Sequence, residues 1–529
     1  MTLRKLTYVF LAFLGLYIAT AGGHLYSPDE EIMFRMTESL ARHGTLAVEP
    51  MLDAQGNSFA TRRGVDGKEY PQYGIGNSLF AVPLYWLGEA LTKVIPDEKA
   101  KSILGFRTVM YIPETSSAPG HDLLRRFTVS FFGSIVAALT ATLLWAFTFT
   151  LCSAESPGEK NSEDTPENPR KCFSPTLVAW LVSIAYGAGT MALPHARTFF
   201  SEPLATLFVG ATFYVLARPW RSPLLSLFLA GVFYALALLT RLDSAVVAPA
   251  VGLFLALRFL EESPEHATLP LSHLDARTAI QYFFSRPFFA RLLAFSIGPV
   301  LFLLLHVTLN WIHFGNPLTS AYADQPEGIQ FRTPLLAGLY GYFMSIGKSV
   351  FLFSPAVVFG LLGWRSFLRQ NLSLGVSLLL AVILLLIFHS RWQNWTGGWC
   401  WGPRHIFMAH LLTLIPSIGF FTAWSRAGRW LFCLLMPIAF AVQLYGASQN
   451  FVDFYILYYR TPETMPNAYV MYSTEDLKPI KAIAPINDSI YVPQNSQWYR
   501  YAEMWQLGYV DNLWLRLLNR ARGSEPPVR

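Results

Sequence analysis

Long apolar runs alternate with short polar connections over most of this chain. A helix needs about 20 apolar residues to cross the hydrocarbon core of a bilayer, and the sequence repeatedly offers runs of that length. We place them near residues 6–23, 126–152, 174–192, 199–217, 223–240, 244–260, 291–312, 345–364, 372–389, 406–424 and 430–448. The pattern predicts an all-α polytopic membrane protein, a bundle of about 11 transmembrane helices.

The first run is also compatible with a signal peptide. Arg4 and Lys5 precede its short apolar core, and Ala19 and Ala21 lie near its end. The later runs need no cleavable signal to reach a membrane. We therefore expect the first run to be retained as a helix.

Composition supports a membrane protein and excludes several other classes. Only 14% of the residues are charged and 53% are hydrophobic, whereas soluble domains have roughly 25% charged residues. Cys152, Cys172, Cys400 and Cys433 form neither close pairs nor the spacing of metal ligands, so neither a disulfide framework nor a zinc site is indicated. We expect no cofactor. A divalent metal is compatible with the sequence, but no carboxylate cluster calls for one.

Basic residues in the short connections predict the orientation of the chain. With eleven spans these residues share one side: Arg4, Lys5, Arg218, Arg221, Arg365, Arg369, Arg426 and Arg429. The positive-inside rule makes that side cytoplasmic, so the net charge of +6 needs no nucleic-acid partner. We divide the chain into a membrane module, 1–448, with a long external loop, 24–125, and an external C-terminal tail, 449–529. The basic end of the tail lies far from any span and carries little topological weight.

The acidic stretch after the first run, "SPDEE", predicts the start of an amphipathic surface helix. Ser27 can cap this helix, Pro28 suits its first position, and Glu30 can complete a capping box. The helix dipole stabilises the carboxylate of Asp29 at this position. That stabilisation does not explain why Asp29 directly follows a membrane span and so lies at the membrane surface. Local physics leaves open whether Asp29 is a helix-start residue or a catalytic one.

The body of this helix follows a regular pattern. Three apolar residues fall on one face: Ile32, Met36 and Leu40. Two pairs of opposite charge lie four residues apart on the other face: Glu31 with Arg35, and Glu38 with Arg42. Gly44 is placed to end the helix.

Charged residues within or beside apolar runs are costly and are therefore candidates for function. Lys348 either snorkels to the external surface or belongs to a site. Arg241 and Asp243 occupy an external turn, where pairing with each other is the simple alternative. Glu202 follows a short external loop, and Pro203 beside it also fits a helix start.

Residues 391–405, "RWQNWTGGWCWGPRH", combine tryptophans, glycines and cations. An aromatic belt at the membrane surface would explain the tryptophans, but it needs neither the glycines nor Arg404. A guanidinium binds phosphate through two parallel hydrogen bonds. We therefore interpret Arg404 as an anion-binding residue, with His405 beside it.

Two segments of the first external loop together resemble a known family. "SPDEEIMFRMTESLARHGTL" follows the first span, and "GKEYPQYGIGNSLFAVPLYWLG" occupies residues 67–88. This arrangement resembles the GT-C glycosyltransferases, in particular the family 39-like branch with protein O-mannosyltransferases and the lipid A aminoarabinose transferase. The resemblance covers roughly residues 1–447.

The resemblance implies an enzyme that transfers a sugar from a polyprenyl-phosphate carrier. It makes Asp29 the catalytic base or acceptor-orienting group, with Glu30 adjacent and Glu202 assisting. It also implies that Lys68 approaches the donor phosphate. The second acid is Glu where Asp is frequent, and "WTGGW" stands where oligosaccharyltransferases have their WWD motif, which argues against transfer of a whole oligosaccharide.

The expected mechanism is an inverting displacement at the external face of the plasma membrane, on the periplasmic side in a cell with two membranes. Five cations are candidates for the donor phosphate: Arg404, Lys68, Lys348, His405 and Arg241. Four aromatic residues are candidates for sugar or lipid contacts, although packing is their simpler role: Tyr70, Tyr73, Trp395 and Trp399. The expected partners are the lipid-linked donor, membrane lipids, and an acceptor that is a glycan, lipid or protein.

Two other functions share the same general features. A lipid-linked-sugar flippase or transporter also has many spans, although it would more often contain internal repeats. An O-antigen ligase or polymerase uses similar substrates but usually has its large loop late in the chain.

Overall fold

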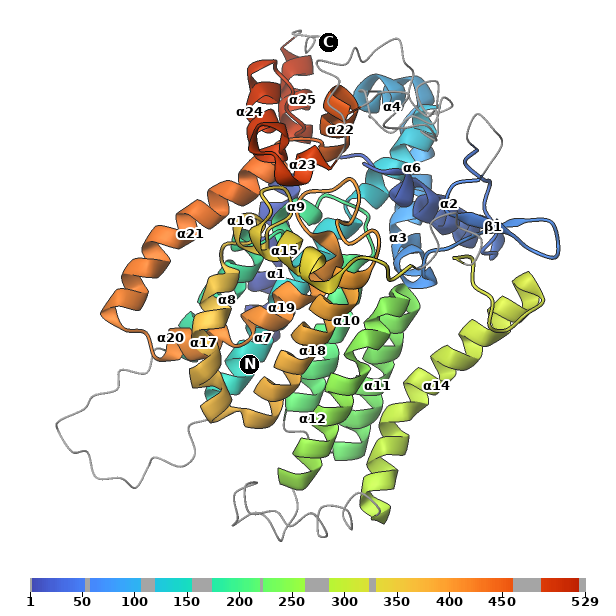
Figure 1. Ribbon diagram of the computed structural model, residues 1–529. Helices are drawn as coiled ribbons and strands as arrows, with labels where there is room; N and C mark the ends of the chain where they lie inside the picture. Colours follow the sequence, from blue (N-terminus) through green and yellow to red (C-terminus); the bar gives the residue numbers. More distant parts are fainter. Residues whose placement is uncertain are drawn as a thin grey trace.

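Helices make up nearly all of the described chain (Figure 1). The computed structural model describes residues 2–52, 58–105, 119–154, 174–218, 222–261, 285–322, 330–459 and 487–522. Two residues named above, Cys172 and Arg221, lie outside these ranges.

Among the described residues up to 261, the chain forms twelve helical elements and one hairpin. They are α1 (Leu3–Ala19), α2 (Pro28–His43), β1 (Thr61–Arg63), β2 (Glu69–Pro71), α3 (Ile75–Thr92), α4 (Asp97–Leu104), α6 (Gly120–Ser130), α7 (Phe132–Ala154), α8 (Pro175–Gly189), α9 (Ala192–His195), α10 (Glu202–Ala217), α11 (Pro223–Thr240), the 3-10 helix η2 (Leu242–Val247) and α12 (Ala248–Glu261).

The second half contains only helices among its described residues. They are α14 (Arg286–Phe314), α15 (Leu335–Met344), α16 (Val350–Phe353), α17 (Val357–Gln370), α18 (Leu372–Arg391), η4 (Arg404–Ile406), α19 (Phe407–Leu414), α20 (Ser417–Thr422), α21 (Arg426–Ala447), α22 (Phe451–Tyr459), α23 (Asp488–Tyr491), η5 (Pro493–Asn495), α24 (Gln497–Gln506) and α25 (Leu513–Ala521).

The predicted all-α polytopic architecture is confirmed. Within the described ranges, seven helical segments are long and apolar enough to cross a membrane: Gly120–Ser153, Pro223–Thr240, Leu242–Glu261, Arg286–Phe314, Leu372–Arg391, Arg404–Thr422 and Arg426–Ala447. Three further predicted runs coincide with shorter helices, α1, α8 and α10, of 17, 15 and 16 residues.

The prediction of one continuous span over residues 345–364 is wrong. The chain there leaves α15, forms the short α16, and enters α17 only at Val357. Ser354 interrupts the helix with φ −147° and ψ 63°, because a residue before proline disfavours the helical conformation. Lys348 therefore lies in the turn between α15 and α16 and not inside a membrane span.

Helix α14 stands at one side of the bundle and packs along α11 (Figure 1). Glycines allow this close approach: a Cβ atom added to Gly298 would lie 2.3 Å from the carbonyl oxygen of Gly231. Most of the surface of α14 faces away from the other helices, as in a helix bathed in lipid.

The predicted amphipathic helix is α2, and it ends at Gly44 with φ 63° as expected. Both predicted ion pairs form, Glu31 with Arg35 at 3.1 Å and Glu38 with Arg42 at 3.3 Å. The predicted capping box is wrong in detail. The Ser27 side chain makes no cap, and Glu30 accepts a hydrogen bond from the backbone N–H of Tyr26.

Helix α2 is also more enclosed than a surface helix. It packs against α3, and Glu31 is buried, where it binds Arg126 of α6 at 2.8 Å. This ion pair connects α2 to the helical segment that carries the second span. Asp29 is therefore held by a rigid part of the structure.

The C-terminal segment lies at the same end of the bundle as α2, α3 and α4 (Figure 1). Leu513 donates its N–H to the Ala21 carbonyl at 2.9 Å, and the Asn512 side chain donates to the Ala19 carbonyl at 3.0 Å. Helix α22 is buried in the main core. The described part of the tail therefore packs on the residues that lead from α1 into α2.

Candidate active site

A cavity of about 560 Å³ lies where α2, α10, α11, α14 and the segment before α19 meet. One part of its wall is polar and includes Asp29, Glu202, Arg241, Asp243, Arg404 and His405. Another part is apolar and includes Leu238, Leu239, Leu242, Phe302, Leu305 and Leu309. The wall of the cavity therefore combines a charged group, called the polar end below, with apolar side chains.

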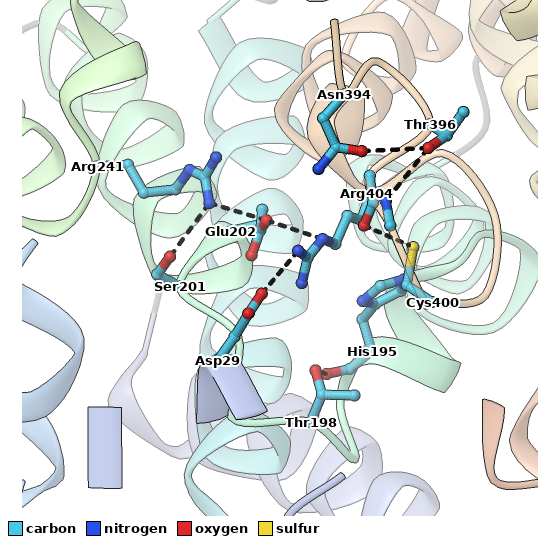
Figure 2. A network of polar contacts seen from close by, with 12 residues as sticks. Asp29, His195, Thr198, Ser201, Glu202, Arg241, Asn394, Thr396, Cys400 and Arg404 are labelled. Carbon is cyan, nitrogen blue, oxygen red and sulfur yellow. Dashed lines mark hydrogen bonds and ion pairs between the residues drawn. The ribbon is translucent and has the colours of Figure 1, made fainter. Parts of the chain in front are cut away.

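Asp29 points into the polar end from the first turn of α2 (Figure 2). Its Oδ2 atom lies 2.7 Å from Nη2 of Arg404, and its Oδ1 atom accepts a hydrogen bond of 2.8 Å from the hydroxyl of Tyr73. The Asp29 side chain is 21% exposed. It is thus oriented by two partners and still reaches the cavity.

Arg404 occupies the centre of this charged group. Its Nε atom lies 3.7 Å from Oε1 of Glu202, and its guanidinium lies 4.3 Å from the centre of the Phe200 ring. The Nε atom makes no hydrogen bond within the described residues. Arg404 therefore retains donor capacity that its carboxylate partners do not use.

A second arginine extends the group. Nη1 of Arg241 lies 2.8 Å from Oε1 of Glu202, and this ion pair is drawn in Figure 2. Nη2 of Arg241 lies 2.7 Å from Oδ2 of Asp243. The simple pairing expected of Arg241 and Asp243 is thus present. Glu202 is the first residue of α10, as its helix-start interpretation required, and it also bridges the two arginines. Carboxylates and guanidiniums alternate along the polar end.

His405 lines the cavity beside this group. Its ring stacks on His389 with the centroids 5.6 Å apart, and the Trp392 ring lies 4.6 Å from it, tilted by 34°. Neither ring nitrogen has a hydrogen-bond partner within the described chain. His405 therefore keeps unused hydrogen-bonding capacity beside the ion pairs.

Glu30 lies behind the site and does not line the cavity. Burial raises the pKa of its carboxyl to about 8, and the hydrogen bond from Tyr26 only partly offsets this. Its neighbour Glu31 behaves in the opposite way. Although burial opposes ionisation, the guanidiniums of Arg126 and Arg35 lower the pKa of Glu31. Adjacent acids of α2 thus have different charge states near neutral pH.

The structure separates two predicted cations from the cavity. Lys68 lies beyond the turn of the β1–β2 hairpin, is 62% exposed, and is 3.9 Å from Asp66. Lys348 is 2% exposed and is enclosed by residues 398–402. Neither lines the cavity. The family resemblance implied that Lys68 approaches the donor phosphate, but the hairpin carries Lys68 outward.

Two of the four predicted aromatic contacts lie in the cavity wall, Tyr70 and Tyr73. Trp395 packs under Tyr342 instead, with the rings 5.4 Å apart. Trp399 stacks on Tyr455 at 5.2 Å. Neither tryptophan lines the cavity, because Trp395 packs against α15 and Trp399 against α22.

Sequence reasoning missed the wall contributed by α14. Residues at helical spacing face the cavity there: Phe302, Leu305, His306, Leu309, Asn310 and His313. His306, Asn310 and His313, which share one face of the second half of this helix, were the available signal. Trp392 and Asn394 also line the cavity, and nothing in the tryptophan-rich stretch distinguished them from their neighbours.

Potential metal ligands do not gather in this part of the protein. Among the described residues, no group of three or more His, Cys, Asp and Glu side chains is arranged to hold a metal ion. The alternating ion pairs leave each cavity carboxylate beside a guanidinium.

Comparison with known proteins finds several similar solved structures, and three of them are given below. A scan of protein-family models found no match, and a search of curated proteins found no relative. The ArnT protein of Cupriavidus metallidurans bound to undecaprenyl phosphate is 11% identical, with a TM-score of 0.44, over 88% of this chain and 68% of that one. The apo state of the same protein is 11% identical, with a TM-score of 0.41, over 79% of this chain and 59% of that one.

The third structure is the Archaeoglobus fulgidus oligosaccharyltransferase tethered with an acceptor peptide. It is 10% identical with a TM-score of 0.42, over 94% of this chain and 63% of that one. This chain thus spans less than two thirds of the oligosaccharyltransferase. With TM-scores below 0.5, these similarities leave the assignment of function to the residues of the cavity.

Proposed function

We propose that this chain is a membrane glycosyltransferase that moves a sugar from a polyprenyl-phosphate carrier to an acceptor at the external face of the plasma membrane. The observation that carries the proposal is the ion pair of Asp29 and Arg404 in a cavity whose wall also carries many apolar side chains. A base and a phosphate-binding cation therefore lie side by side.

The charged and the apolar side chains of the cavity wall fit the two ends of such a donor. A prenyl chain gains free energy when apolar surface leaves water, and Leu239, Phe302 and Leu305 provide an apolar wall. A sugar phosphate needs hydrogen-bond donors and positive charge, which Arg404 supplies. The lipid tail would remain among the apolar residues while the anomeric carbon reaches Asp29.

Asp29 is the proposed general base. In an inverting displacement, a carboxylate opposite the leaving group removes the proton of the attacking hydroxyl. Tyr73 holds Oδ1 of Asp29, and Arg404 holds Oδ2. When a phosphate binds Arg404 in place of Asp29, Oδ2 becomes free to take the proton of the acceptor hydroxyl. The polyprenyl phosphate leaves with the electron pair of the glycosidic bond.

Arg404 is the proposed phosphate-binding residue. Negative charge on the phosphate grows as the glycosidic bond breaks, so a fixed guanidinium stabilises the transition state more than the ground state. Glu202 and Arg241 lie behind Arg404 and orient it, because Glu202 bridges both arginines. His405 is placed to contact the phosphate or the sugar.

Transfer in a defined membrane tests this function. Purified protein in liposomes would receive labelled polyprenyl-phosphate sugars and candidate glycan, lipid and protein acceptors. We expect label to appear on an acceptor with wild-type protein and not with Asp29→Asn. Movement of label across the bilayer without transfer would instead indicate a flippase.

A further inference from the structure

The loop from Gly397 to Gly402, called the glycine loop below, closes around the side chain of Lys348. The Nζ atom donates to the carbonyl oxygens of Gly398 at 3.2 Å, Cys400 at 3.3 Å and Gly402 at 3.1 Å. The Sγ atom of Cys400 lies 3.4 Å from the same nitrogen. An ammonium group has three N–H donors, so these carbonyls account for all of them.

Backbone conformation explains why the carbonyls converge. Gly397, Gly398 and Gly402 have φ values of 78°, 65° and 69°, a left-handed region that other residues rarely adopt. These turns bring the carbonyls to one side of the loop. Buried carbonyls need donors, and Lys348, itself 2% exposed, supplies them from the turn before α16.

The other side of the glycine loop supports Arg404. A Cβ atom added to Gly397 would lie 2.8 Å from Cγ of Arg404 and 3.5 Å from the Sγ atom of Cys400. Gly402 precedes Arg404 by only two residues. The stem of the arginine therefore rests on the loop while its guanidinium reaches Asp29 at 2.7 Å.

We propose that Lys348 is a positioning residue that sets the place of Arg404 by holding the glycine loop, and that it does not bind the donor phosphate itself. This inference rests on the proposed function, in which Arg404 contacts the phosphate. It assigns a role to a buried lysine that the sequence presented as a candidate phosphate ligand. Lys348 lies outside the cavity and acts through the carbonyls of the glycine loop, on which the stem of Arg404 rests.

Two measurements on the full chain in lipid nanodiscs test this role. Backbone hydrogen exchange reports on residues 396–404, and equilibrium binding of undecaprenyl phosphate reports on Arg404. For Lys348→Met we expect faster exchange in that segment and about tenfold weaker binding. Binding by Arg404→Ala should fall as well, and adding Lys348→Met to it should cause no further loss, because both changes act through one contact.

Lys348→Arg keeps a cation under the loop and should recover part of the protection and affinity; it also replaces the Met variant if that one does not fold. Lys99→Met, in an exposed lysine of α4, is the matched control and should change neither measurement. If the two changes reduce undecaprenyl phosphate affinity additively and backbone hydrogen exchange is unchanged, Lys348 contacts the phosphate directly and the inference is overturned. Faster exchange with unchanged affinity would overturn it too. If wild-type protein fails to bind undecaprenyl phosphate, the proposed function fails, and the inference falls with it.

Discussion

The Nη2 atom of Arg404 lies 2.7 Å from Oδ2 of Asp29, so two residues 375 positions apart form one ion pair in the cavity. The pair joins the first turn of α2 to the segment that opens α19. Each partner satisfies the charge of the other in the absence of substrate. Under the proposed function, a donor phosphate would compete with Asp29 for Arg404, and that competition would link donor binding to release of the base.

Removal of the proposed base should stop transfer without removing the donor site. Asp29→Asn keeps the size of the side chain and its hydrogen bond with Tyr73, but it lowers proton affinity. We expect transfer to fall by at least about 100-fold, the usual effect of a general base, with polyprenyl-phosphate binding retained. Glu98→Gln, in an exposed acid of α4, is the control. Near-normal transfer by Asp29→Asn would refute the assignment.

Removal of the proposed phosphate ligand should act on donor affinity. Arg404→Ala deletes charge-assisted hydrogen bonds, which contribute about 1.5–3 kcal/mol each. We therefore expect affinity for polyprenyl phosphate to fall about 10- to 100-fold, measured by equilibrium binding in nanodiscs. Arg332→Ala changes an exposed arginine near the cavity and should have no effect. Unchanged affinity in Arg404→Ala would move the phosphate site elsewhere.

The acids behind Asp29 should give stability a characteristic pH dependence. The pKa of Glu30 is raised to about 8 from an ordinary value of 4.5, so between these pH values the folded state holds a proton that the unfolded state has lost. Its contribution to stability is therefore greatest below pH 4.5 and falls as the pH rises to about 8, by at most about 5 kcal/mol.

Glu30→Gln keeps an oxygen for Tyr26 and removes this titration. We expect its melting temperature in detergent to rise above that of wild type as the pH goes from 5 to about 8. Glu31→Gln is the matched comparison, because the pKa of Glu31 is lowered and its charge stabilises the fold. That variant should melt below wild type over the same range. Parallel curves for Glu30→Gln and wild type would show that Glu30 is not protonated.

The tail and the first loop should be accessible from the same side of the membrane. Asn519 on α25 and Lys99 on α4 are exposed residues of these two segments, and Arg520 of α25 donates to the backbone carbonyl of Ile103. In a cysteine-free background, Asn519→Cys and Lys99→Cys should both react with a membrane-impermeant maleimide in intact cells, while Arg369→Cys should not. Labelling of Arg369→Cys alone would reverse the proposed orientation.

The sequence by itself determined the features that depend on neighbouring residues. Apolar runs predicted the helices because a bilayer imposes a length on each span, and the helix start at Pro28 with its end at Gly44 followed from local backbone preferences. Arg404 stood out because a guanidinium beside glycines has no simple role in an aromatic belt. Asp29 was singled out by the family resemblance more than by its local setting.

Only the tertiary structure decided which of these residues meet. Asp29, Tyr73, Glu202 and Arg404 come from four separate segments, and no periodicity relates them. Lys68 and Lys348 were both candidates for the donor phosphate. The β1–β2 hairpin carries Lys68 outward, whereas three backbone carbonyls surround the buried side chain of Lys348. Ion pairs and cavities depend on distances between segments far apart in the chain, which packing sets and local pattern does not contain.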